Sequence, residues 1–219
     1  NSPEKHYVEG YEPDAQTSMA IEQLKELKDC GKPFALFLSL GTPHDPWTPE
    51  NVPGEYLDRF RGVEFRLPEN YLPENDPYAD NWAKLSPQER KDLPEWMRVY
   101  YAMVANLDDN IGRLMDAIQR MGLDENSILV FTSDHGELFG AHGRRAKNIF
   151  YEEAVRVPFF LRYAAGGLTG GTSDLCLNTV DLMPTLLPMM GLPCPQEAEG
   201  FDCSGRLLGT SAAEPDGAL

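Results

Sequence analysis

One short apolar run leads directly into a group of polar residues, and it limits the fold more than any other stretch of the chain. Residues 128–131 are Ile, Leu, Val and Phe, and Asp134, His135 and Gly136 follow them closely. A short apolar run of this kind predicts a buried strand. In open α/β sheets, ligands bind just beyond the carboxyl ends of the strands. We therefore expect a functional site where this strand ends.

Other segments predict the elements around this strand. Residues 34–40 are nearly all apolar and predict a second buried strand, which ends at a loop that contains His44. A third strand is expected over 157–163. Apolar residues at helical spacing predict helices over 17–28, 95–121 and 181–190, with Asp14 and Asp181 as caps. Strands that alternate with helices predict an α/β fold with a largely parallel sheet flanked by helices.

Composition excludes several classes of partner. The chain of 219 residues has 19 basic and 35 acidic side chains, so its net charge is −16. Nucleic acids and anionic membrane surfaces require clustered Lys and Arg, so we expect neither as a partner. No apolar run approaches the 18 residues or more of a membrane-spanning helix. The sequence leaves the oligomeric state unknown.

Three further features describe the organisation of the chain. Residues 48–95 are rich in Pro, Asn, Asp and Glu and predict a long surface excursion, which is either a substrate-facing lid or a plain insertion. Residues 210–219 are expected to form a loose tail. Cys194 and Cys203 could pair in an oxidising compartment, but free thiols in a larger fold explain them equally well.

The polar residues after the strand at 128–131 are candidates for binding a metal ion and an anion. Asp134 offers a hard oxygen that suits calcium or magnesium, whereas His135 offers a nitrogen that better suits a transition metal. Without its context, this tripeptide more often marks a turn that ends a strand. Lys147 would bind a tetrahedral anion as a point charge, and His142 lies in a glycine-rich loop that could bring it near the ligand. Arg144 and Arg145 are alternatives, although each is more simply explained as a solvated loop charge.

These candidates belong to a longer pattern. Residues 133–143 read SDHGELFGAHG, and Lys147 and the sequence VRVPF at 155–159 follow. Together with the segments at 43–47, 100–112 and 180–186, they resemble in order and spacing the motifs of the sulfatase family, within the alkaline-phosphatase-like superfamily. The resemblance covers most of residues 10–210.

The resemblance implies a role for each candidate. Asp134 and His135 would be ligands of a divalent cation, usually calcium. Lys147 would bind the sulfate group, His44 would contact the sulfate or the leaving oxygen, and His142 would bind substrate. The implied fold is a partial alkaline-phosphatase-like fold, and the implied substrate is a sulfated small molecule or glycan. Family resemblance also suggests a periplasmic, extracellular or lysosomal location.

One expected part of such an enzyme is missing from these residues. The nucleophile of the family is a formylglycine made from Cys or Ser in a Cys/Ser-x-Pro/Ala-x-Arg motif, and this motif is absent. We therefore expect residues 1–209 to be the central part of a sulfatase catalytic domain, inactive alone and binding calcium weakly. Two alternatives remain open: a phosphonate or phosphate ester hydrolase of the same superfamily, and a non-catalytic homologue that binds a sulfated glycan or serves as a scaffold.

Overall fold

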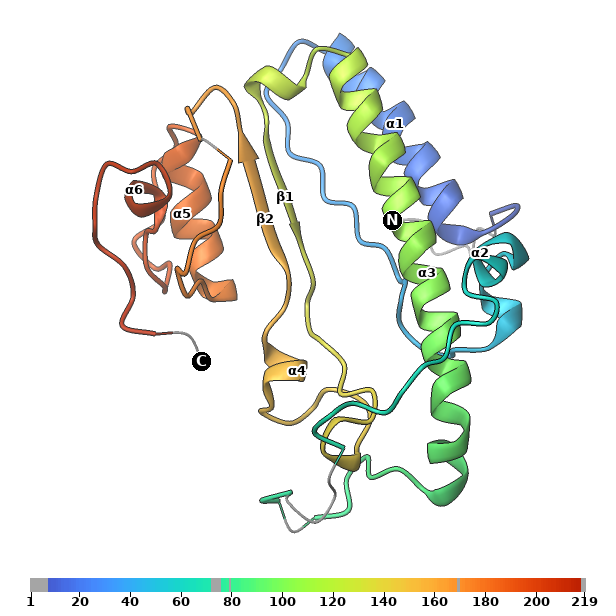
Figure 1. The fold of residues 1–219 in the computed structure, drawn as a ribbon. Helices are drawn as coiled ribbons and strands as arrows, with labels where there is room; N and C mark the ends of the chain where they lie inside the picture. The colour runs from blue at the N-terminus through green and yellow to red at the C-terminus, as the bar shows by residue number, and fades with distance from the viewer. Residues whose placement is uncertain (1–7, 72–75, 79, 169, 218–219) are drawn as a thin grey trace. The chain divides into compact units, whose positions relative to one another are not determined.

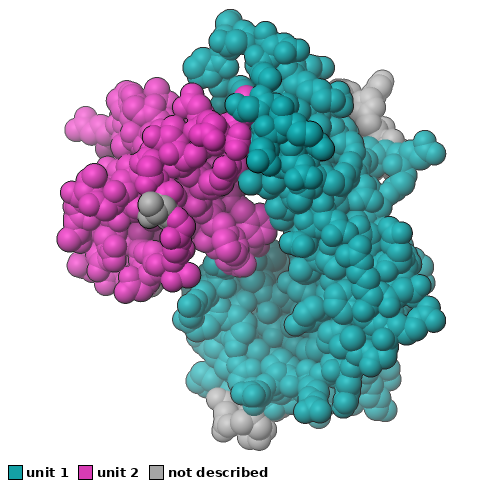
Figure 2. Space-filling model, turned by 45° about the horizontal axis from the view of Figure 1, so that its top comes forward, with its two compact units in different colours: residues 1–122, 135–157 teal, residues 123–134, 158–219 magenta. Residues whose placement is uncertain are grey.

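The computed structural model describes residues 8–71, 76–78, 80–168 and 170–217. Six helices and two strands are assigned in this part of the chain (Figure 1). They fall into two compact units, residues 1–122 with 135–157 and residues 123–134 with 158–219 (Figure 2). None of the described helices is both long and apolar enough to cross a membrane.

The longest element of unit 1 is helix α3 (Pro87–Arg120). Ser86 and Glu89 form a capping box at its start, in which each side chain bonds the backbone N–H of the other residue. The predicted helix over 95–121 is confirmed, but it begins at Pro87, because the capping box starts the helix and Pro94 is accommodated inside it. Apolar side chains of α3 are buried in two clusters and give unit 1 much of its core. They include Leu93, Met97, Val99, Ala102 and Met103.

Helix α1 (Glu12–Asp29) lies alongside α3 (Figure 1). Asn106 and Asn110 of α3 are buried, and both amides donate to Oδ1 of Asp14 in α1, at 2.9 and 2.6 Å. The predicted helix is confirmed, but the prediction that Asp14 caps it is wrong. Tyr11 is the N-cap, since Pro13 is well suited to a first turn and moves the start of the helix forward. The Asp14 carboxylate instead joins the two helices.

The excursion predicted over 48–95 contains regular structure. Its first part forms the short helix α2 (Gly54–Arg59), and its last part is the start of α3. Val52, Tyr56 and Leu57 are buried against α3. Residues 49–59 therefore contribute to the core of unit 1, and the described residues between 60 and 86 are more irregular.

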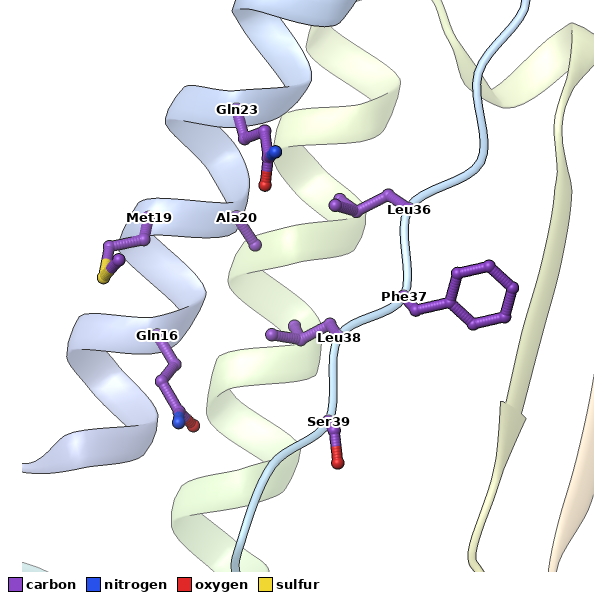
Figure 3. Close-up of a pocket in the computed structure, with 8 residues that line it drawn as sticks. All are labelled: Gln16, Met19, Ala20, Gln23, Leu36, Phe37, Leu38 and Ser39. Atoms are coloured by element: carbon purple, nitrogen blue, oxygen red, sulfur yellow. The ribbon is translucent and has the colours of Figure 1, made fainter. Parts of the chain in front are cut away.

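Residues 33–40 are extended but are assigned to no sheet among the described residues. Successive side chains of an extended chain point to opposite sides. Leu36 and Leu38 point toward α1 and line a pocket of about 240 Å³ with it, whereas Phe37 points away and is 93% exposed (Figure 3). The predicted strand is thus extended, but no described segment pairs with it, and in this respect the prediction differs from the structure.

The strand expected over 128–131 forms, but its residues are half-buried or exposed rather than buried. Unit 2 thus contains two strands, β1 (Ile128–Thr132) and β2 (Phe159–Tyr163), at the positions predicted from the apolar runs. They pair antiparallel, with Ile128 opposite Tyr163 and Thr132 opposite Phe159. The α/β class is confirmed, but the expectation of a largely parallel sheet is wrong for this pair. A parallel crossover needs a connection that is usually a full helix, and the residues between β1 and β2 contain only a three-residue 3-10 helix (Ala141–Gly143) and the four-residue helix α4 (Glu152–Val155).

The rest of unit 2 is built around helices α5 (Leu182–Met189) and α6 (Ser204–Leu207). Asp181 is the N-cap of α5, and its buried carboxylate accepts the backbone N–H groups of Asn178 and Phe201, at 2.8 and 2.7 Å. All four cysteines are free thiols, so Cys194 and Cys203 are not paired. In the expected tail, Glu214 bonds Arg206 at 3.3 Å.

Candidate functional site

The loop at 41–47 holds His44 in a fixed place. The indole Nε1 of Trp47 donates to the carbonyl of Pro43 at 2.8 Å, and the amide of Asn51 donates to the carbonyl of Pro46 at 2.9 Å. The Trp47 ring also packs against the ring of Phe139, with centroids 4.6 Å apart. The loop is therefore braced from two sides, and its backbone does not depend on the His44 side chain.

A second loop, over 135–147, returns on itself and so brings Lys147 close to where it starts. Gly136 donates to the carbonyl of Ala154 at 2.8 Å, and a Cβ at this position would lie 2.0 Å from the carbonyl oxygen of Glu153, so only glycine fits there. Across the loop, Leu138 donates to the carbonyl of Ala146 at 3.0 Å. These bonds fix both ends of the loop.

The Glu137 carboxylate strengthens the same loop from inside. Its Oε1 accepts the backbone N–H groups of Ala146 and Phe139, at 2.5 and 3.4 Å. Burial raises the pKa of Glu137, and the two N–H groups and the nearby Lys147 ammonium partly oppose that rise. Sequence reasoning assigned no role to Glu137, and the structure shows that it organises the loop that carries Lys147.

Three of the predicted site residues come together in unit 1, and we call them the histidine–lysine group: His44, His135 and Lys147. Nζ of Lys147 lies 2.6 Å from Nε2 of His44, although 103 positions separate the two residues in the chain. The rings of His44 and His135 meet edge to face with their centroids 6.0 Å apart. One ammonium and two imidazoles at half-exposed positions form a site suited to a small anion.

Asp134 is the last residue of its stretch of unit 2, and the peptide bond to His135 connects the two units. The hydroxyl of Ser133 donates to its Oδ1 at 3.4 Å. Among the described residues, no group of three or more His, Cys, Asp or Glu side chains comes together as a metal site. Calcium takes six to eight oxygen ligands, so Asp134 and His135 do not form a calcium site by themselves.

His142, the remaining predicted site residue, contacts other partners. Its ring stacks on the ring of Tyr151 with centroids 3.7 Å apart and planes 7° from parallel. Its Nε2 lies 3.4 Å from both the Asn70 amide and a Glu153 carboxylate oxygen. These contacts attach the 135–147 loop to the excursion at residue 70.

Arg144 is the residue whose environment differs most from its expected one. Its side chain is fully buried and donates to the carboxylates of Asp76 and Asp80, and Tyr151 donates to Asp76 at 2.6 Å. Burial by itself would raise the pKa of Asp76, but the bonds from Tyr151 and Arg144 outweigh burial and hold the pKa well below its ordinary value. We call these residues the Arg144 cluster: Arg144, Asp76, Asp80 and Tyr151.

The expectation that Arg144 is a solvated loop charge or binds an anion is therefore wrong. Its neighbour Arg145 bonds Glu89 at 2.9 Å and is 45% exposed. The nearest sequence signal for the cluster is the acid-rich stretch that contains Asp76 and Asp80, but nothing in it identifies Arg144 as the partner.

A pocket of about 340 Å³ opens beside His44. Its lining includes Thr42 and the carboxylates of Glu12, Asp45 and Glu50, and no Lys or Arg of the described part of the chain is among its lining residues. The site thus combines a cationic group with a neighbouring acidic pocket. A small anion that contacted Lys147 would thus have carboxylates on its other side.

Comparison with known proteins assigns the chain to a family. The family model named Sulfatase matches residues 1–192. The ulvan-active sulfatase of Formosa agariphila is 32% identical over 207 residues, which cover 93% of this chain and 37% of that protein. The chain belongs to the sulfatase family, as its motifs indicated.

Comparison with solved structures supports the same family assignment. The crystal structure of yidJ from Bacteroides fragilis, described as a sulfatase, matches with a TM-score of 0.77 and 34% identity over 94% of this chain and 43% of that chain. A protein solved with its substrate D-glucosamine-2-N,6-O-disulfate matches with a TM-score of 0.75 and 26% identity over 98% of this chain and 54% of that chain. The fold is the alkaline-phosphatase-like fold expected from the sequence, and the chain spans only part of each relative.

Proposed function

We propose that this chain supplies one side of the active site of a sulfuric ester hydrolase. The observation that carries the proposal is the approach of Lys147 to His44 at 2.6 Å, with His135 beside them. Two segments that are far apart in the sequence, the loop that carries His44 and the loop over 135–147, thereby converge on one place that suits an anion. Membership of the sulfatase family supports a sulfate ester as that anion.

The chemistry of the reaction fits these side chains. Cleavage of a sulfate ester places negative charge on the sulfate oxygens and on the leaving oxygen. Groups that are fixed in advance and aimed at developing charge stabilise a transition state, and removal of one such group typically costs about 10²–10³-fold in rate. We assign Lys147 to the sulfate oxygens and His44 to the sulfate or the leaving oxygen. His142 remains a proposed substrate contact from the sequence, at the edge of the same loop.

Two further components would complete the site. Asp134 and His135 are proposed as two ligands of a divalent cation, calcium by resemblance, with the other ligands contributed by residues outside the described set. The formylglycine nucleophile is likewise proposed to come from residues outside these 219, because none of the residues present matches its motif. The chain alone is therefore expected to be inactive.

The proposed substrate is a sulfated small molecule or glycan. One structural relative was solved with a disulfated glucosamine as its substrate. The pocket beside His44 would hold the part of the alcohol next to the sulfate, and its carboxylates disfavour a second sulfate at that position. We therefore expect the group in this pocket to be uncharged or cationic.

The proposal is tested with the full-length gene product and a panel of aryl sulfate, sulfated glucosamine, phosphate and phosphonate esters. Sulfate esters should be hydrolysed fastest, and monosulfated compounds should be preferred to disulfated ones. Preference for phosphonate, or lack of any hydrolysis, would reject the assignment. The 219-residue chain alone should be inactive and should bind calcium weakly, with less binding after Asp134→Ala. Equal calcium binding by the two chains would remove Asp134 from the site.

A further inference from the structure

Asp45 contacts the side of the His44 ring opposite Lys147. Nδ1 of His44 lies 2.7 Å from Oδ1 of Asp45 and 3.1 Å from the Asp45 carbonyl oxygen. Nε2, the other ring nitrogen, lies 2.6 Å from Nζ of Lys147. Both nitrogens of the ring therefore have a polar partner, and the two partners have opposite charge.

These contacts are consistent with only one tautomer of a neutral imidazole. A lysine ammonium can only donate hydrogen bonds, so Nε2 must accept one with its lone pair. The ring proton then lies on Nδ1. A carboxylate and a carbonyl can only accept, so Nδ1–H donates to Asp45. The charges on the two sides of the ring thus select the Nδ1–H form.

We propose that Asp45 is a positioning residue, which holds the His44 ring so that Nε2 faces Lys147 and the anion. A catalytic histidine commonly depends on a third group that fixes its orientation and tautomer. The proposal rests on the proposed sulfatase activity for its catalytic consequence, but the orientation of the ring is independent of it. Without the Asp45 carboxylate, a half-exposed ring could rotate and present Nδ1 to the anion instead.

The Asp45 side chain can be changed without loss of the loop. The loop at 41–47 is held by the bonds from Trp47 to Pro43 and from Asn51 to Pro46, which do not involve the Asp45 carboxylate. The Asp45 side chain is itself 56% exposed, so its replacement leaves no cavity. A variant at this position should fold normally and report on the histidine alone.

The kinetic experiment compares four forms of the full-length gene product with 4-nitrophenyl sulfate as substrate: the unmodified protein, Asp45→Ala, Asp45→Asn and Asp58→Asn. We expect Asp45→Ala to lower kcat about tenfold and to change KM less than about twofold. Asp45→Asn should retain part of the lost rate, because its amide oxygen can still accept from Nδ1–H. Asp58→Asn is the matched control: Asp58 lies in α2, is 63% exposed and bonds Arg61 at 2.6 Å, so this substitution should leave kcat unchanged.

A second measurement is independent of activity. Long-range ¹H–¹⁵N correlation spectra of the histidine-labelled protein distinguish the two tautomers, and His44→Gln identifies the signal. His44 should be an Nδ1–H tautomer in the unmodified protein and a mixture in Asp45→Ala. An Nε2–H tautomer in the unmodified protein, or equal kcat for Asp45→Ala in an active enzyme, would overturn the role of Asp45. An inactive unmodified protein would instead reject the proposed function, and the spectra would still decide the orientation of His44.

Discussion

Two cations in one loop have opposite surroundings. The Arg144 side chain is fully buried and pairs with the carboxylates of Asp76 and Asp80. Lys147 lies three positions further on and contacts His44, whose side chain is 49% exposed. The two cations of the loop therefore differ in role: Arg144 attaches the loop to the excursion, whereas Lys147 is accessible to the proposed anion. Stability and chemistry should respond to different substitutions.

The largest expected effect is on stability, from Arg144→Met. The substitution would leave the buried Asp76 carboxylate without its main partner, and breaking a buried ion pair in this way typically costs about 3–5 kcal/mol. The free energy of unfolding in urea measures the loss. Arg145→Met is the matched control, because its half-exposed bond to Glu89 is worth no more than about 1 kcal/mol. Equal losses for the two variants would show that the Arg144 cluster is not what holds the loop.

Lys147→Ala should lower activity strongly and stability little, the opposite of what is expected for Arg144→Met. Removal of a fixed cation from the anion site should lower kcat/KM of the full-length gene product about 10²–10³-fold. The free energy of unfolding should change by less than about 1 kcal/mol, since this side chain is not buried in an ion pair. Lys91→Ala on the exposed face of α3 controls for loss of one positive charge. If Lys147→Ala lowered the free energy of unfolding as much as Arg144→Met does, the contrast between the two cations would be wrong.

This contrast also marks what the sequence could predict. Lys147, His44 and His135 follow recognisable motifs, so their convergence could be expected before the structure was known. Arg144 and Arg145 are neighbours in the chain, and no local pattern distinguishes the buried one from the exposed one. Burial of Arg144 depends on Asp76, which is 68 positions away. Pairing across such a distance is a property of the folded chain.

The fold, too, could be predicted from the sequence only where local patterns determine it. The apolar pattern of the sequence predicted α3, whose buried residues recur at helical spacing, and the positions of β1 and β2, which lie on short apolar runs. It did not predict how β1 and β2 pair, since the direction of pairing depends on the connection between them and not on the repeat in either strand. It also placed Asp14 at a helix end, where its residue type is common, whereas the buried amides of Asn106 and Asn110 use its carboxylate inside α1.

The smallest expected effect is on the pH dependence of stability. Hydrogen bonds from Tyr151 and Arg144 hold the pKa of Asp76 below its ordinary value. A carboxyl whose pKa is lowered by folding stabilises the protein fully above its unfolded pKa of about 3.9, and this stabilisation is lost as the pH falls through the folded pKa. The contribution of Asp76 should therefore be fully present at neutral pH and should be lost progressively below about pH 5.

Urea unfolding between pH 7 and pH 3 measures this contribution as a slope. Stability should fall more steeply below about pH 5 in the unmodified protein than in Asp76→Asn, because only the carboxylate can take up a proton in this range. Asp109→Asn is the matched control. Asp109 also bonds an arginine and a tyrosine, Arg59 and Tyr56, but its side chain is 43% exposed, so solvent screens the pair and the slope should stay near that of the unmodified protein. If Asp109→Asn flattened the slope as much as Asp76→Asn does, burial would not be what distinguishes the Arg144 cluster from an ordinary surface pair.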